Sequence, residues 1–188
     1  MTAHRTSLRF QPAWSSRLFA STVAVAVLAL GACTPTFNWR DVPIGKKGMV
    51  ALLPCKADRA TRAQPFGGES VDVDMAGCEA GGATFAVAHA NAVDAMQAET
   101  WLRAWRSSIH SQLEGQKTRE MPAVVSGAAT TPAPWELQTL DGGAGTPVRI
   151  RWFAQRASTG VSLYQAMVLG RPSSEEAIET FFEGLRLP

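Results

Sequence analysis

The hydrophobic and polar positions of this 188-residue chain change period several times, and each change predicts a new element. Residues 49–53 are an apolar run that ends at a proline, which is the pattern of a short strand. After a polar stretch that predicts a loop to Glu69, residues 71–75 alternate strictly between apolar and polar side chains, as a half-buried strand does. Residues 83–89 alternate again after a Gly-Gly turn. Three successive strands, arranged as a meander, are therefore expected.

The period then lengthens to between three and four residues. Between residues 93 and 113 the apolar positions recur three and four residues apart, which predicts an amphipathic helix with one buried face. These positions are Ala98, Trp101, Leu102, Trp105, Ile109 and Leu113. Residues 114–134 show no period, so we expect a long loop there.

Two hairpins and a helix are predicted after this loop. Residues 135–140 and 147–156 flank a glycine-rich segment that tolerates positive φ, and the run 161–169 returns after a Ser-Thr-Gly turn. Ser173, followed three residues later by Glu176, has the spacing of a capping box at a helix start. The apolar stripe of this last helix is Ile178, Phe181, Phe182 and Leu185.

The order of these elements, βββαβββα, predicts an α+β fold with a single antiparallel sheet of about six strands and two amphipathic helices. Both helices carry apolar stripes that need sheet surface to cover. We expect one sheet face to be core, with the residues Val71, Val73, Phe85, Val87, Ile150 and Trp152 on it. This order, with its Phe-Phe-x-x-Leu-Arg-Leu end helix, is similar to the PsbP/Mog1-like alpha-beta-alpha sandwich. The resemblance implies a fold and no chemistry.

The first 32 residues have the layout of a secretory signal. A basic start without acids precedes an apolar run from Leu18 to Leu30, and small residues follow. The run has about 13 residues, fewer than the roughly 20 that a helix needs to cross a bilayer.

Leu30, Gly31, Ala32 and Cys33 resemble the lipobox of bacterial lipoproteins. The resemblance implies that a diacylglyceryl group is attached to the Cys33 thiol, that the signal is cut before Cys33, and that the new amine is acylated. The membrane would then be a partner through this lipid. Thr34 stands where an Asp would favour inner-membrane retention, which implies an outer-membrane lipoprotein facing the periplasm. An ordinary signal peptide that ends near a cysteine, or an uncleaved short anchor, are the alternatives.

The mature chain divides into a lipidated tether at residues 33–48, with scattered Pro and Gly, and a single domain at residues 49–188. Removing residues 1–33 removes three Arg and no acid, so Lys plus Arg falls from 18 to 15 against 16 Asp plus Glu, and the net charge changes from +2 to −1. A near-neutral domain does not indicate nucleic acid as a partner.

With Cys33 assigned to lipid, Cys55 and Cys78 remain as an even pair in an oxidising compartment, and we expect a disulfide. Closing a loop of roughly 24 residues would stabilise the fold by about 3 kcal/mol. A metal site is the rival interpretation. It would need two further ligands, and His89 and His110 lack the spacing of zinc ligands.

Several charged residues are candidates for chemistry or binding. Asp72 and Asp74 share one face of a strand, where alternation alone places polar side chains outward, and a carboxylate pair for acid–base chemistry is the alternative. His89, at the end of its strand, is expected to be a hydrogen-bonded residue at the core edge rather than a base, since no nucleophile can be placed beside it.

Two rows of cations could form a surface for an anionic partner. Arg103, Arg106 and His110 line the polar face of the first helix, and Arg149 and Arg151 share one face of a strand. Solvated faces are the default interpretation of both rows. A common concavity lined by the two rows would favour a bound ligand.

Three classes of function remain. The leading prediction is a membrane-anchored, non-enzymatic periplasmic lipoprotein that acts as an envelope interaction or assembly component with a protein partner. The alternative is a periplasmic binding module for a small or anionic ligand. An enzyme is the third class, but the chain has no nucleophile elbow, phosphate loop or metal box, so no cofactor or catalytic residue is expected.

Overall fold

The computed structural model describes residues 35–45, 48–140 and 145–188, so the lipobox and the rest of the signal lie outside the described residues. The folded unit is Thr36–Pro188. Its elements are β1 Arg40–Pro43, β2 Val50–Leu53, β3 Asp58–Phe66, β4 Glu69–Ala80, β5 Ala83–Ala92, α2 Ala95–Gln112, β6 Thr118–Pro122, β7 Trp135–Thr139, β8 Val148–Arg156, β9 Val161–Gly170, α3 Glu176–Glu183 and β10 Leu185–Arg186.

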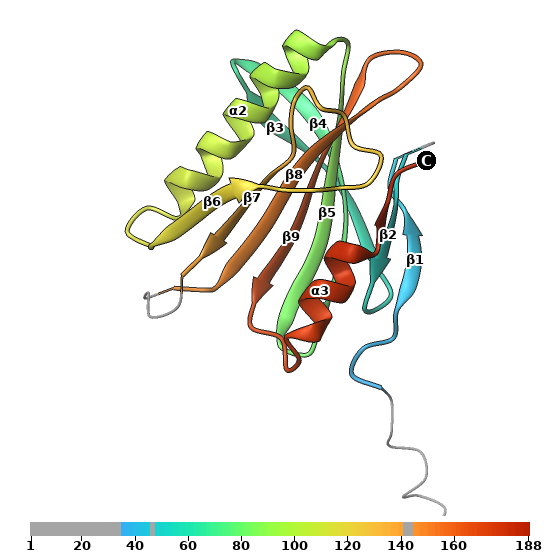
Figure 1. The fold of residues 1–188 in the computed structure, drawn as a ribbon, viewed down its shortest axis with the longest axis vertical. Coiled ribbons are helices and arrows are strands. Elements are labelled where there is room, and N and C mark those ends of the chain that lie inside the picture. Colours follow the sequence, from blue (N-terminus) through green and yellow to red (C-terminus); the bar gives the residue numbers. More distant parts are fainter. Residues whose placement is uncertain (1–34, 46–47, 141–144) are drawn as a thin grey trace, which may run out of the picture. The chain divides into compact units, whose positions relative to one another are not determined.

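The strands form two antiparallel sheets (Figure 1). The larger is seven-stranded, in the order β3-β4-β5-β9-β8-β7-β6, and the smaller is three-stranded, in the order β1-β2-β10. Local hairpins build most of the larger sheet. In the β4–β5 hairpin Ala80 pairs with Ala83, and Gly81 and Gly82 supply the two positive φ angles, 60° and 88°, that a tight turn of this kind requires.

The predicted fold class, a single sheet of about six strands in the order βββαβββα, is wrong. Two sheets with seven and three strands are present, and the fold is mostly β. The resemblance to the PsbP/Mog1-like sandwich was inferred from that order, which the structure does not have. The strands that the sequence did not predict lie at sheet edges or are short. Strand β3 is exposed at its first six positions, so its sequence shows no alternation. Strands β1 and β10 have only four and two residues.

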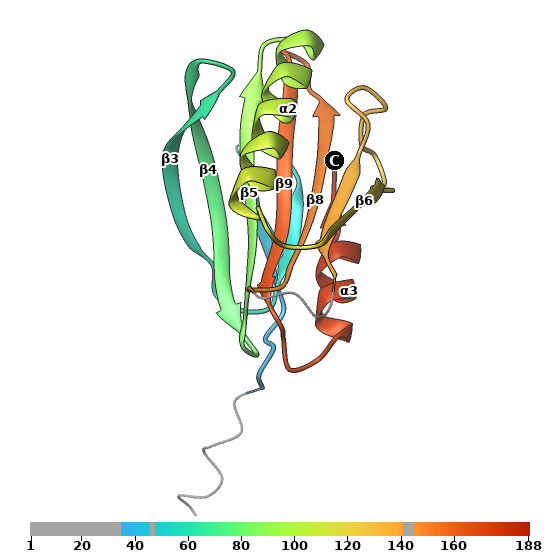
Figure 2. The ribbon, with the colours of Figure 1, turned by 90° about the vertical axis from the view of Figure 1, so that its left-hand side faces the viewer.

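Both faces of the large sheet are buried, which corrects the expectation of one core face. Helix α2 lies over one face (Figure 2), and Trp101, Leu102 and Trp105 pack there against Val71, Val73, Ile150 and Trp152. Helix α3 and the small sheet cover the other face, where Phe85 and Val87 are fully buried. The six predicted core residues are therefore all buried, but on opposite faces.

Helix α2 agrees with its predicted range. Asp94 is the N-cap, and its carboxylate accepts a hydrogen bond of 2.8 Å from the backbone N–H of Gln97. Helix α3 is present, but the capping box is not: Glu175 is the N-cap and makes no side-chain cap bond. The stripe of α3 is buried as expected at Phe181 and Phe182.

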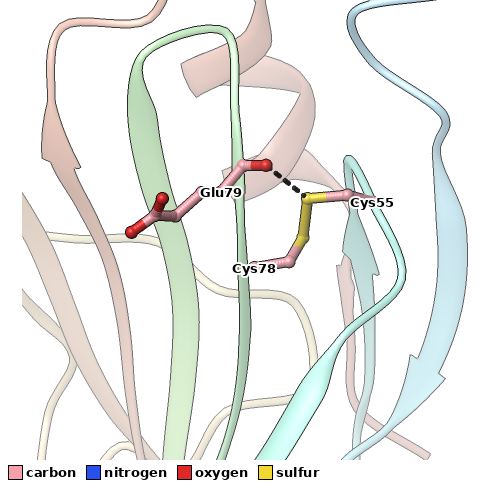
Figure 3. Close-up of a disulfide and its surroundings, with 3 residues drawn as sticks. All are labelled: Cys55, Cys78 and Glu79. Atoms are coloured by element: carbon pink, nitrogen blue, oxygen red, sulfur yellow. Dashed lines mark hydrogen bonds between the residues drawn. A yellow bond between two sulfur atoms is a disulfide. The ribbon is translucent and has the colours of Figure 1, made fainter. Parts of the chain in front are cut away.

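Cys55 and Cys78 are joined by a disulfide, with their α carbons 5.9 Å apart. The bond links the segment after β2 to β4, so it ties the small sheet to the large one (Figure 3). The Sγ atom of Cys55 lies 3.3 Å from the carbonyl oxygen of Glu79. An oxidised sulfur carries no hydrogen, so this is a close contact and not a hydrogen bond.

The folded unit begins before Met49, within the segment predicted as a tether. Residues Arg40–Pro43 form β1, and Val42 and Ile44 are buried. Phe37 and Trp39 stack on each other and pack edge-on against Phe85. These contacts join distant parts of the chain, which local periodicity does not reveal.

Candidate functional site

A cavity of about 250 Å³ lies between α2 and the strands beneath it, and we call it the α2 pocket. Trp105 and Ile109 of α2, and Leu113 at its C-cap, line one side of the pocket. Its other lining residues are Gln64, Pro65, Phe66, Val73, Met75, Ala88, Ser108, Gln112, Val148, Ile150, Gln165, Met167 and Leu169. None of them is charged, so the walls are apolar except for three amides and one hydroxyl.

The pocket exists because β5 presents small side chains to α2. Ala88, Ala90 and Ala92 face the helix from this central strand, whereas the bulky Phe85 and Val87 alternate to the other face. Of the three alanines, Ala88 lines the pocket, and its small side chain leaves space under α2 that protein atoms do not fill.

Gln165 on β9 is the buried polar group of the α2 pocket, with only 4% of its surface exposed. Its Oε1 accepts a hydrogen bond of 2.7 Å from the indole N–H of Trp152, which fixes the orientation of the amide. In the part of the chain that the structure describes, its Nε2 donates only to the thioether sulfur of Met167, at 3.6 Å. Because a thioether is a weak acceptor and an amide nitrogen carries two hydrogens, a donor is left inside the pocket.

His89 and Tyr164 form a second buried group, on the opposite face of the sheet. Their rings stack at 5.0 Å, and Tyr164 stacks in turn on Phe153 at 5.3 Å. Burial lowers the pKa of His89, against opposing effects of Asp74 and Asn91, and burial raises the pKa of Tyr164.

His89 differs in one respect from its expected role. Within the described residues its Nδ1 has no hydrogen-bond partner, although a side-chain hydrogen bond with Asn91 acts to raise its pKa. The side chain is 4% exposed, so it lies inside the core and not at the predicted core edge. A Cβ added at Gly45 would come within 2.9 Å of its ring, so the segment after β1 covers it closely.

Asp72 and Asp74 are both exposed, as alternation predicts. The Thr61 hydroxyl donates a hydrogen bond of 2.7 Å to Asp74 Oδ1. In the strand register Asp74 is opposite His89. The two carboxylates therefore lie on the exposed surface of β4 and line no part of the α2 pocket.

The cations of α2 are paired within the fold. Arg106 donates to Glu120 of β6 at 2.7 Å and lies over the Trp135 ring at 4.9 Å, and His110 Nε2 is 2.8 Å from the same carboxylate. Burial acts to raise the pKa of Glu120, but the hydrogen bonds from Arg106 and His110 outweigh it, so the pKa is lowered.

The cations of β8 are paired on the opposite face. Glu136 of β7 is buried and accepts hydrogen bonds from Arg149 at 2.7 Å and from Arg151 at 2.8 Å. Arg149 also reaches Glu179 of α3, and both guanidinium groups lie over the Phe182 ring. This cluster fastens α3 to the sheet.

The structure does not bring together the two rows of the predicted anionic-partner surface, and that surface stays a prediction. Arg106 and His110 lie on the α2 face, and Arg149 and Arg151 lie on the α3 face, so the two rows share no concavity. Arg103 makes an exposed pair with Glu99 at 3.8 Å. Sequence spacing along one element does not show this pairing, because Glu120 and Glu136 belong to other strands.

Among the described residues no group of three or more His, Cys, Asp or Glu side chains could hold a metal ion, and no described helix has the length and apolar character to cross a membrane. The chain was also compared with known proteins. No protein family, curated protein or solved structure matches it significantly.

Proposed function

We propose that this protein is a lipoprotein anchored through Cys33 to the outer membrane, facing the periplasm, and that its folded unit works by binding a small, mostly apolar molecule rather than by catalysis. The observation that carries the binding role is the α2 pocket. Pockets for small molecules are typically concave and apolar with a few placed polar groups, and this one has apolar walls and a buried amide.

The same pocket supports a non-enzymatic role. Among the described residues Ser108 supplies the only hydroxyl that lines the pocket, and no histidine or carboxylate lines it there. General acid–base and nucleophilic catalysis need such a neighbour within hydrogen-bond reach. The internal pairing of the arginines likewise favours a neutral ligand over an anionic one.

The anchor is supported by the lipobox resemblance. Thr34 and Pro35 alone separate Cys33 from the folded unit, so a lipid on Cys33 would hold the domain close to the bilayer. Two or three acyl chains anchor a protein stably, whereas one binds only marginally. In membrane fractionation Cys33→Ser should release the protein or block its processing. A mature wild-type chain with an unmodified thiol would contradict the anchor.

Filling the α2 pocket tests the binding role. Ala88→Leu places a larger side chain on the pocket floor and should abolish the binding of a neutral aliphatic probe such as nonan-2-one, measured by tryptophan fluorescence. Ala63→Leu is the matched control, because Ala63 is exposed on β3 and does not line the pocket. Equal binding by wild type and Ala88→Leu, or none by wild type, would contradict this role.

A second candidate is an envelope interaction or assembly component that acts through protein contacts. It is favoured by the exposed large apolar residues Val93, Met96 and Val124, which are 75%, 77% and 91% exposed. A crosslinking pulldown with the lipid intact tests it: Met96→Ser should lose a partner that the wild-type chain retains.

A further inference from the structure

The shape of the α2 pocket limits its ligand to a single narrow chain. An apolar cavity of about 150 Å³ holds benzene, which has six non-hydrogen atoms. At the same volume per atom, a cavity of 250 Å³ holds a molecule of about ten non-hydrogen atoms. Trp105 and Leu113 both line the pocket and are eight residues apart on the helix, about 12 Å along its axis. The mean cross-section is therefore about 20 Å², which suits one hydrocarbon chain better than a fused ring system.

The walls adapt to a chain. Met75 and Met167 are partly exposed on β4 and β9 and pack at the edge of the pocket. Methionine side chains are flexible and polarizable, so they conform to aliphatic ligands of varied shape. The long acyl chains of a membrane phospholipid exceed the volume of the pocket, so the ligand is a free molecule of medium length.

The charge of the pocket limits the ligand further. None of the lining residues is charged, and an ionised group buried without a partner is strongly disfavoured. The ligand is therefore neutral along the part that the pocket encloses.

Gln165 adds a polar requirement. Its Oε1 is engaged by Trp152, and its Nε2 has only the Met167 sulfur as acceptor. A buried donor without a good acceptor costs about 1–3 kcal/mol. A ligand oxygen that accepts from Nε2 removes this cost, whereas a pure hydrocarbon does not.

We infer that the α2 pocket binds a neutral, single-chain aliphatic molecule of about ten non-hydrogen atoms, whose carbonyl or hydroxyl oxygen accepts a hydrogen bond from Gln165 Nε2. This inference rests on the proposed binding function and names the chemical class of its ligand. It assigns Gln165 as the residue that selects an oxygen-bearing chain over a hydrocarbon.

The test uses two probes of similar size, nonan-2-one and decane, with wild type and Gln165→Leu. Leucine keeps the bulk of the side chain but has no N–H. The ketone should lose about tenfold in affinity, while the affinity for decane should stay constant or rise. A matched loss for both probes, or no loss for the ketone, would overturn the role of Gln165.

A second measurement does not depend on the stability of the variant. In wild-type protein labelled with ¹⁵N, nonan-2-one should shift the side-chain amide signals of Gln165 by forming a hydrogen bond, and decane should shift them much less. If both probes bind and neither shifts these signals, the inference fails and the binding function stands. If neither probe binds the wild type, the binding function itself fails.

Discussion

His89 is the residue whose surroundings differ most from its sequence context. It ends a predicted strand, yet it is 4% exposed, stacked on Tyr164 and covered by the segment after β1. Burial favours its neutral form and lowers its pKa below the usual 6.5. The unfolded chain therefore binds a proton at a pH where the folded protein does not.

This difference makes stability depend on pH. Because the unfolded state binds more protons below pH 6.5, the free energy of unfolding should fall as the pH drops from 6.5 towards the lowered pKa of His89, and should be constant with respect to this residue above 6.5. In His89→Gln this slope should disappear. Urea titrations of both proteins between pH 8 and pH 5 measure it, and equal slopes would exclude His89 as the cause.

Glu136 is a buried carboxylate at the centre of an ion cluster. It is buried between two arginines that are themselves only 23% and 14% exposed. Removing one partner of a buried ion cluster leaves charge uncompensated and typically costs 3–5 kcal/mol. Glu136→Gln should therefore destabilise the fold by about that amount in denaturant melts.

The matched control for Glu136 is Glu99→Gln, which breaks the exposed pair with Arg103. Exposed pairs in helices contribute about 0.3–0.5 kcal/mol, so the control should change stability by no more than that. Similar effects from the two variants would mean that the Glu136 cluster is open to solvent and that its arginines are available to an anionic partner.

Among the elements, those with a regular period were predictable from the sequence and those at the edges were not. Helix α2 buries one stripe, and β4 and the first half of β8 bury alternate positions, so their periods appear in the sequence. Strand β5 is buried on both faces, and the glycine turn before it and its apolar run mark it instead. Strand β3 is exposed on both faces at most positions, and β6 has no fully buried residue. Their pairing depends on backbone hydrogen bonds to a neighbour, which leave no hydrophobic pattern.

The buried apolar stripes of the two helices predict that shortening one of their aromatic side chains to alanine lowers the stability of the domain strongly. Trp105 packs on Phe66 at 5.0 Å, and Phe181 is fully buried against Phe85 at 5.6 Å. Trp105→Ala and Phe181→Ala should each destabilise the domain by about 3–5 kcal/mol. Met96→Ala is the control: Met96 is on α2 but 77% exposed, so its loss should change little. A cost under about 1 kcal/mol at Trp105 or Phe181 would show that the helix concerned is peripheral.

At the scale of the whole molecule, alternation shows which side chains of one strand share a face. It does not show which faces of different strands lie on the same side of the sheet. The one-face core failed for this reason, because Phe85 and Ile150 belong to opposite faces once the strands pair. The candidate site was beyond sequence reasoning for the same reason. Gln165 is a polar residue in a mostly apolar strand, and its role depends on Trp152 from the adjacent strand and on Ala88 of β5.

Residues 36–48 belong to the folded unit because they contact both sheets. Strand β1 pairs with β2, while Ile44 and Gly45 pack over the buried group of His89 and Tyr164. A chain that begins at Met49 loses the buried side chains of Val42 and Ile44, each worth about 1.5–3 kcal/mol.

A chain that begins at Met49 should therefore be less stable than one that begins at Thr36 by roughly 5 kcal/mol or more, once the β1 pairing is included. The same truncation uncovers His89, so its protonation should no longer differ between the folded and unfolded states, and the slope of stability below pH 6.5 should shrink. Urea melts of the two chains at pH 8 and pH 5.5 measure both effects. A stability difference within about 1 kcal/mol would return residues 36–48 to the role of a tether, and a persistent slope would mean that His89 is buried by the large sheet alone.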